Sequence, residues 1–157
     1  MQMTIWVTAF ACAIMAGTYF AFSSFVMNSL AVLPRAQGIA AMQSINRVIL
    51  SSSFMVLFFG SAAASLGLGV WGIRGWGDPG SMYLVGGSLL YVVGMVVCTA
   101  AFNVPLNDGL EALDPAGTAA VEVWATYLRD WTRYNHVRTF FSAAASAVFV
   151  TAAWVAR

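Results

Sequence analysis

The chain has 157 residues, of which 61% are hydrophobic and 8% are charged, and seven basic residues against six acidic ones give it a net charge of +1. Soluble domains are about half apolar and about a quarter charged, so this composition indicates an integral membrane protein. The nearly balanced charge excludes a basic nucleic-acid-binding face, and the length fits one membrane domain over residues 1–157.

Four apolar segments are long enough to cross a hydrocarbon layer of about 30 Å, which takes about 20 helical residues. In chain order these predicted spans are residues 4–33, 48–73, 82–102 and 137–156. The first has no basic n-region and is too long for a signal peptide, so we expect a retained helix. We therefore predict an all-α fold, an integral membrane four-helix bundle in contact with the lipid bilayer.

The connections between the predicted spans differ in length and composition. Residues 74–81 are rich in glycine and also contain aspartate and proline, which suits a tight turn. The connection to the fourth span is longer and breaks at Pro105 and Gly109. A helix is expected over residues 115–134, with Asp114 as its cap. Apolar residues recur there at spacings of three and four, which predicts an amphipathic helix at the membrane interface.

Arginine is distributed unevenly over the two sides of the membrane. The side that carries the connections 34–47 and 103–136 has five arginines and the opposite side has two, namely Arg74 and Arg157. By the positive-inside tendency the long connections face the cytoplasm, and the predicted location is the bacterial cytoplasmic membrane. Small residues in the second and fourth spans allow close helix packing and leave a homo-oligomer open.

Polar side chains of all four spans gather at the ends that share the side of the long connections. The candidates for substrate binding are Tyr19, Ser23, Asn28, Asn46, Asn103, Asn107, Trp131 and Tyr134. Ionisable groups at membrane depth are costly and tend to face the bundle interior. The pattern predicts a pocket for a hydrophobic aromatic small molecule. Its expected walls are Phe20, Phe22, Phe25, Phe54, Phe58 and Phe102.

The start of the fourth span provides the candidates for catalysis, Asn135, His136 and Arg138. Arg138 offers a permanently charged fork of donors, and His136 offers a base that titrates near neutrality. Asn135 and Arg138 share one helical stripe, with His136 about 100° around the helix. A structural alternative is also open, in which these residues face lipid headgroups and the asparagines bond neighbouring helices.

Metal and cofactor sites are poorly supplied with ligands in this sequence. It contains one histidine, and both cysteines lie inside apolar segments, where they are expected to fill the core. A three-histidine site, a facial triad and bis-histidine haem are therefore excluded. A haem or metal ion at His136 is disfavoured, and no metal site or cofactor is predicted.

The quoted motifs carry a resemblance that covers nearly the whole chain. "GTYFAFSSFVMNSLAVLP", "GIAAMQSIN", "FFG", "NVPLND" and "WTRYNHVRT" occur in this order. With them the chain resembles the anthrone oxygenase-like family of small four-helix membrane proteins. "NVPLND" and "WTRYNHVRT" are the most specific, although Tyr134 stands where tryptophan is more usual in the family.

The resemblance implies oxidation of an anthrone to an anthraquinone by dioxygen, without a recognised cofactor motif. His136 would then take the acidic methylene proton, and Arg138 or the amides of Asn46, Asn103 and Asn135 would stabilise the oxyanion. The predicted function is a membrane-embedded, cofactor-independent oxygenase of an anthrone-like or related phenolic, lipid-soluble substrate. The alternative is a non-enzymatic membrane protein that binds a quinone or lipid, or an accessory subunit of a membrane complex.

Overall fold

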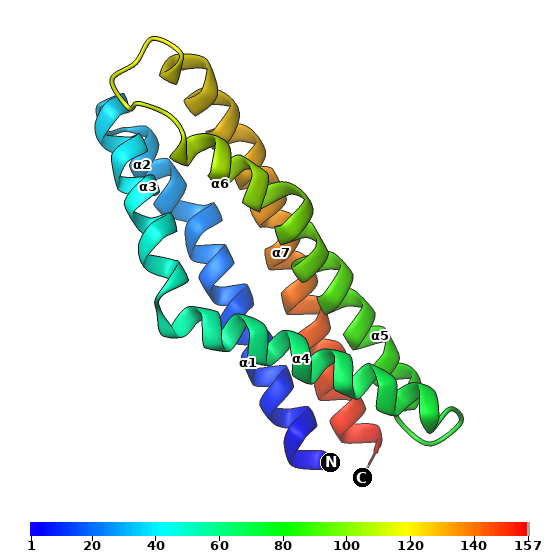
Figure 1. Ribbon diagram of the computed structural model, residues 1–157. Helices are drawn as coiled ribbons and strands as arrows, with labels where there is room; N and C mark the ends of the chain where they lie inside the picture. Colours follow the sequence, from blue (N-terminus) through cyan, green and yellow to red (C-terminus); the bar gives the residue numbers. More distant parts are fainter. Residues whose placement is uncertain (157) are drawn as a thin grey trace.

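The computed structural model describes residues 1–156, which form long helices joined by short turns (Figure 1). The elements are α1 (Gln2–Ala21), η1 (Phe22–Val26), α2 (Met27–Ala31), α3 (Arg35–Leu50), α4 (Ser53–Arg74), α5 (Ser81–Tyr91), η2 (Val92–Val97), η3 (Thr99–Asn103), α6 (Val104–Glu111) and α7 (Ala120–Val155). The segments η1, η2 and η3 are π-helical turns inside longer helices. Such turns occur often at functional sites.

Four helical stretches within residues 1–156 are long and apolar enough to cross a membrane: Gln2–Ala31, Ser53–Arg74, Ser81–Glu111 and Ala120–Val155. This confirms the predicted helical membrane bundle. The orientation of the bundle in the membrane and its self-association stay predictions.

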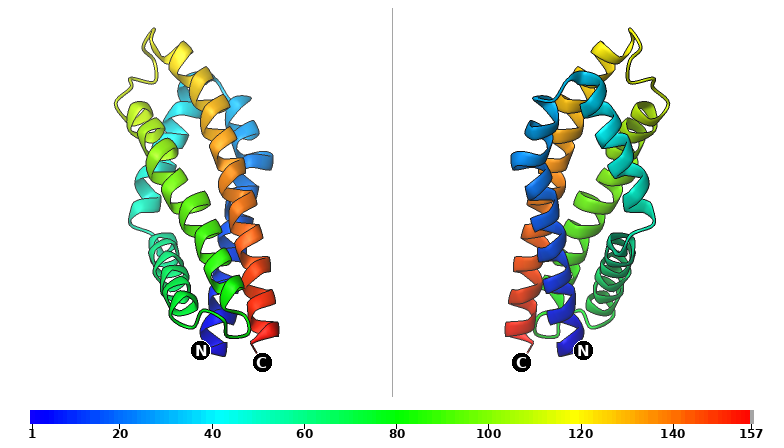
Figure 2. Two further views of the ribbon diagram at one scale, coloured as in Figure 1. Left: turned by 90° about the vertical axis from the view of Figure 1, so that its right-hand side faces the viewer. Right: turned by 90° about the vertical axis from the view of Figure 1, so that its left-hand side faces the viewer.

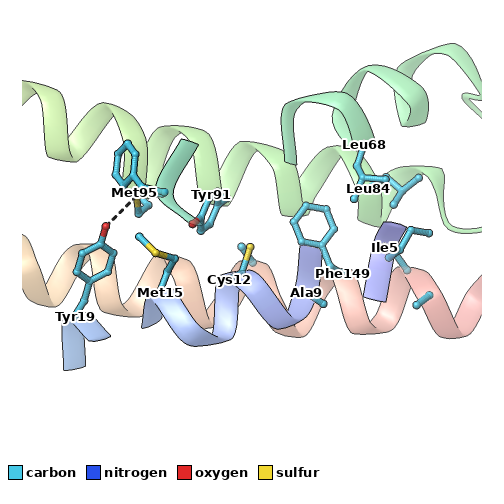
Figure 3. Packing of buried hydrophobic residues seen from close by; sticks show 14 residues of the cluster. Ile5, Ala9, Cys12, Met15, Tyr19, Leu68, Leu84, Tyr91, Met95 and Phe149 are labelled. Carbon is cyan, nitrogen blue, oxygen red and sulfur yellow. Dashed lines mark hydrogen bonds between the residues drawn. The ribbon is translucent and has the colours of Figure 1, made fainter. Parts of the chain in front are cut away.

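The first and last helices lie side by side and run in opposite directions, so both ends of the chain meet at one end of the bundle (Figure 1). Hydrogen bonds join them there: Ser146 Oγ donates to the carbonyl oxygen of Ala9 at 2.8 Å, and Gln2 Nε2 donates to that of Ala153 at 2.6 Å. The core beside them packs buried side chains such as Met15, which Figure 3 shows from close by. This end of the bundle is therefore closed by packing.

The opposite end of the bundle is built from α2, α3, α6 and the first half of α7 (Figures 1 and 2). A second buried cluster holds these elements together, and it consists of Met27, Leu30, Ile39, Met42, Leu110, Ala120, Trp124, Tyr127 and Trp131. Gln43 adds polar contacts, because its Nε2 donates to the carbonyl oxygens of Leu110 and Leu113 at 2.8 and 2.9 Å. The polar residues singled out in the sequence lie between this cluster and the first one.

The amphipathic segment predicted over 115–134 is helical from Ala120 onward, but it is not a separate helix. It is the first half of α7, which continues without a break to Val155. Residues 120–155 contain no glycine and no proline, so nothing in the local sequence ends the helix. Asp114 does not cap it, because its Oδ1 accepts from the backbone N–H of Ala116 at 3.0 Å within a turn.

Two further predictions about the chain path were wrong. The connection 34–47 was expected to be a loop, but it forms most of α3. The break expected at Pro105 does not occur, because this proline lies in the first turn of α6, where a missing backbone N–H costs least. The third membrane helix thus continues to Glu111.

The chain bends sharply between α3 and α4, in an elbow at Ser51 and Ser52 (Figure 1). Ser52 caps α4, because its hydroxyl accepts from the backbone N–H of Phe54 at 3.3 Å. Its hydroxyl also donates to the carbonyl oxygen of Ile49 at 2.8 Å at the end of α3. The three serines of "SSSF" therefore stop one helix and start the next, and the elbow forms one side of the cavity described below.

Candidate functional site

A cavity of about 340 Å³ lies between α1, the α3–α4 elbow, the η2–η3 region and α7. Its volume falls within the range of roughly 300–1,000 Å³ typical of small-molecule sites. Most of its lining is aliphatic or aromatic. The residues with polar groups among the lining are Thr18, Tyr19, Asn46, Thr99, Asn107, Trp131 and Arg138.

The cavity is deep on the α1–α7 side and open on the other. Tyr19 and Arg138 at the deep side are 3% and 5% exposed, whereas Leu50 and Phe59 are 69% and 63% exposed. Val104, on α6, is also an exposed lining residue. The mouth is therefore apolar and lies between the α3–α4 elbow and the η3–α6 helix, which suits entry of a lipid-soluble molecule.

Arg138 is the only charged residue among the described lining residues. Its guanidinium carbon lies 4.3 Å from the ring centre of Tyr19 and 5.1 Å from that of Trp131, which are cation–π distances. Nη2 donates to Asn135 Oδ1 at 2.6 Å, and Nη1 makes a long contact of 3.5 Å with Thr99 Oγ1. Aromatic rings and neutral acceptors surround this cation.

No carboxylate pairs with Arg138 in the part of the chain that the structure describes. The ion pairs found there are Arg47–Glu111 at 2.6 Å and Arg129–Asp130 at 2.7 Å. The Nε atom of Arg138 is buried and has no hydrogen-bond partner among residues 1–156. A buried charge without a counter-ion is costly, so this guanidinium is prepared to bind an anionic or strongly polar group from outside the chain.

Asn135 holds the guanidinium in place and ties α7 to α1. Its Nδ2 donates to the carbonyl oxygen of Tyr19 and to Ser23 Oγ, both at 2.6 Å, while its Oδ1 accepts from Arg138. Asn135 is fully buried. Its amide therefore fixes both the rotation of α7 and the direction of the charged side chain.

Asn107 organises the opposite end of the cavity. Its Oδ1 accepts from the Tyr127 hydroxyl and from Trp131 Nε1, both at 2.8 Å. Nearby, Asn103 Nδ2 donates to the carbonyl oxygen of Trp131 at 3.3 Å. These bonds join the third membrane helix to α7 and fix the Trp131 ring that faces the guanidinium.

Residues 54–148, more than half of the chain, match the anthrone oxygenase family. The chain belongs to the anthrone oxygenase family. Among curated proteins and solved structures, none matches the chain. The family match includes Asn107, Trp131, Asn135 and Arg138, whereas Tyr19 lies outside the matched range.

Of the site residues predicted from the sequence of this family member, Tyr19, Asn46, Asn107, Trp131 and Arg138 line the cavity. Ser23, Asn103 and Asn135 are buried behind the lining and make the hydrogen bonds described above. The structure therefore brings these eight together around one space. It leaves three outside the cavity, namely Asn28, Tyr134 and His136.

His136 lies on the exposed side of α7 and does not line the cavity. Successive residues in an α-helix are about 100° apart, so His136 is about 200° around the helix from Arg138. Once Asn135 and Arg138 face α1, His136 faces outward. The geometry therefore gives no support to its predicted role as a base in contact with the substrate.

The other two outlying residues have local partners. Asn28 is exposed, and its Nδ2 donates to the carbonyl oxygen of Ser24 at 3.1 Å. Tyr134 stacks on Phe102 with ring centres 4.3 Å apart. Of the phenylalanines predicted to form the walls, Phe22, Phe54 and Phe58 do so. The prediction was wrong for three that face outward, Phe20, Phe25 and Phe102.

Sequence reasoning missed the contribution of α3, whose Met42, Ile45 and Ile49 line the cavity. Their spacing of three to four residues indicates an amphipathic helix and is the signal that was available. It was passed over because residues 34–47 were assigned to a loop. Thr99, in η3, was also missed.

The cysteines and the acidic residues do not form a metal-binding group in the described structure. Residues 1–156 contain no cluster of three or more histidine, cysteine, aspartate or glutamate side chains placed to hold a metal ion. Cys12 and Cys98 are free and buried, in line with core filling. A reaction that needs no cofactor stays a prediction.

Proposed function

We propose that this chain is a membrane-embedded oxygenase that binds an anthrone-like or related phenolic molecule as its oxyanion beside Arg138. The observation that carries the proposal is the buried guanidinium, which lines a mainly apolar cavity without a carboxylate partner among the described residues. Membership of the anthrone oxygenase family supports an oxygenase-type activity. The substrate and the steps below belong to the proposal.

The guanidinium favours the ionised form of the substrate. A fixed cation in a water-poor site stabilises a developing oxyanion without having to reorganise. Among the described lining residues none is a histidine or a carboxylate. We therefore propose that Arg138 raises the acidity of the bound substrate and that the proton leaves to water at the mouth, with no protein base in contact with the substrate.

Dioxygen is the proposed oxidant, and the reaction balances with it alone. The substrate anion gives one electron to dioxygen, and the resulting radical and superoxide combine to form a carbon–oxygen bond at the methylene carbon. Protonation yields a hydroperoxide. Loss of the remaining hydrogen on that carbon, with cleavage of the O–O bond, releases water and leaves a carbonyl. The aromatic walls formed by residues such as Phe54 and Phe58 limit access of water to the carbanion.

The test is dioxygen uptake by detergent-purified protein supplied with anthrone, after subtraction of autoxidation. Arg138→Gln removes the charge and is expected to lower the rate about 100-fold or more. Arg138→Lys keeps a charge but loses the planar fork, so an intermediate rate is expected. His136→Ala is the matched control on the same helix and is expected to keep the wild-type rate.

Two results would contradict the proposal. Full activity of Arg138→Gln would show that the cation does not stabilise the reacting anion. Loss of activity in a folded His136→Ala protein would return the role of base to the histidine. Anthrone binding by wild-type protein without dioxygen uptake would favour the binding-protein alternative.

A further inference from the structure

Asn46 presents an unused hydrogen-bond donor to the same cavity from the wall opposite α7. It lies in α3 and lines the cavity, and its Nδ2 is buried without a hydrogen-bond partner among residues 1–156. The adjacent Tyr127 hydroxyl lies outside hydrogen-bond geometry for this amide and gives its own proton to Asn107. A buried amide donor without an acceptor is unfavourable, so such groups call for a functional explanation.

Free donors thus lie on more than one wall of the cavity. Besides Asn46 Nδ2 on α3, Nε of Arg138 on α7 is unpartnered within the described chain. The hydroxyl protons of the lining threonines are already used, because Thr18 donates to the carbonyl oxygen of Ile14 and Thr99 to that of Met95. A ligand that satisfies this cavity must therefore bring acceptor atoms at two separate positions.

We infer that Asn46 is a specificity-determining residue that donates through Nδ2 to a second oxygen of the substrate, distinct from the oxyanion at Arg138. The substrate class is then a polycyclic aromatic with oxygen atoms at two separated ring positions. This inference rests on the proposed function, because it takes the oxyanion at Arg138 as given. It adds that α3, which sequence reasoning took for a loop, reads the far edge of the substrate.

The test compares two probes of nearly the same size, anthrone with one oxygen and 9,10-anthraquinone with two on opposite edges. Their dissociation constants are measured without dioxygen by quenching of tryptophan fluorescence in detergent. Asn46→Leu removes the donor at similar volume, and Asn46→Ala removes it without adding bulk. Both are expected to weaken anthraquinone binding about threefold to tenfold, the range of one net hydrogen bond, and to change anthrone binding less than about twofold.

Asn28→Leu is the matched control, because Asn28 is exposed and lies outside the cavity. It is expected to change neither dissociation constant. The two Asn46 variants are expected to agree, so the smaller one carries the test if the larger one does not fold. Each variant is first shown to be monodisperse, with a Tm close to that of the wild type.

The outcomes separate this inference from the proposed function. Unchanged anthraquinone binding, or an equal loss for both probes, would overturn the role of Asn46 while leaving the site at Arg138 intact. Wild-type protein that binds neither probe would overturn the proposed function and the inference with it. Selective loss of anthraquinone supports both.

Discussion

Replacement of Arg138 by methionine separates a structural role from a functional one. Methionine keeps an unbranched side chain but removes a guanidinium that is 5% exposed. The ring contacts with Tyr19 and Trp131 are worth about 2 kcal/mol when desolvated, and the charged hydrogen bond to Asn135 about 1.5–3 kcal/mol. Against this loss, an arginine at membrane depth costs about 2.5–3.5 kcal/mol on insertion scales.

The two sides balance to within about 2 kcal/mol, because Arg138 has no described counter-ion that would be left behind. Loss of one partner of a buried ion pair costs more, about 3–5 kcal/mol. At about 2–4 °C per kcal/mol for a chain of this size, we expect Arg138→Met to change Tm by less than about 8 °C. The assay is thermal unfolding in detergent, followed by light scattering or tryptophan fluorescence.

The same assay with ligand gives the functional half of the prediction. A ligand at about 100 times its Kd stabilises the wild type by about 2.7 kcal/mol, and we expect no such shift in the methionine variant. A drop in Tm of more than about 10 °C without ligand would refute the reasoning. The guanidinium would then be part of the structural framework, as the alternative from the sequence holds.

Two further substitutions test the framework of the site. Asn135→Leu removes hydrogen bonds to three partners and should lower stability by about 2 kcal/mol, seen as a lower Tm, whereas Asn28→Leu should have little effect. Equal Tm values would contradict this. Gly94→Ala places a methyl group 2.1 Å from Phe141 Cγ and should cost about 1–3 kcal/mol, whereas Gly60→Ala, with nothing within 4 Å, should not. A stable Gly94→Ala protein would show that α7 can move.

Local properties of the sequence determined the class of protein and the number of its membrane helices. Length and hydropathy of a segment decide whether it can span a bilayer, and these do not depend on the rest of the fold. Connectivity then placed the polar ends of all four spans on one side. For this reason Tyr19, Asn46, Asn107 and Arg138 were predicted together, and the structure places them around one cavity.

Only the tertiary structure decided which side of each helix faces the cavity. In a membrane both the lipid-facing and the core-facing sides of a helix are apolar, so hydrophobic periodicity does not fix its rotation. The rotation of α7 is set by packing and by the bonds of Asn135 to α1, which turn Arg138 inward and leave His136 outside. The wall formed by α3 likewise depends on contacts with α6, which no local pattern specifies.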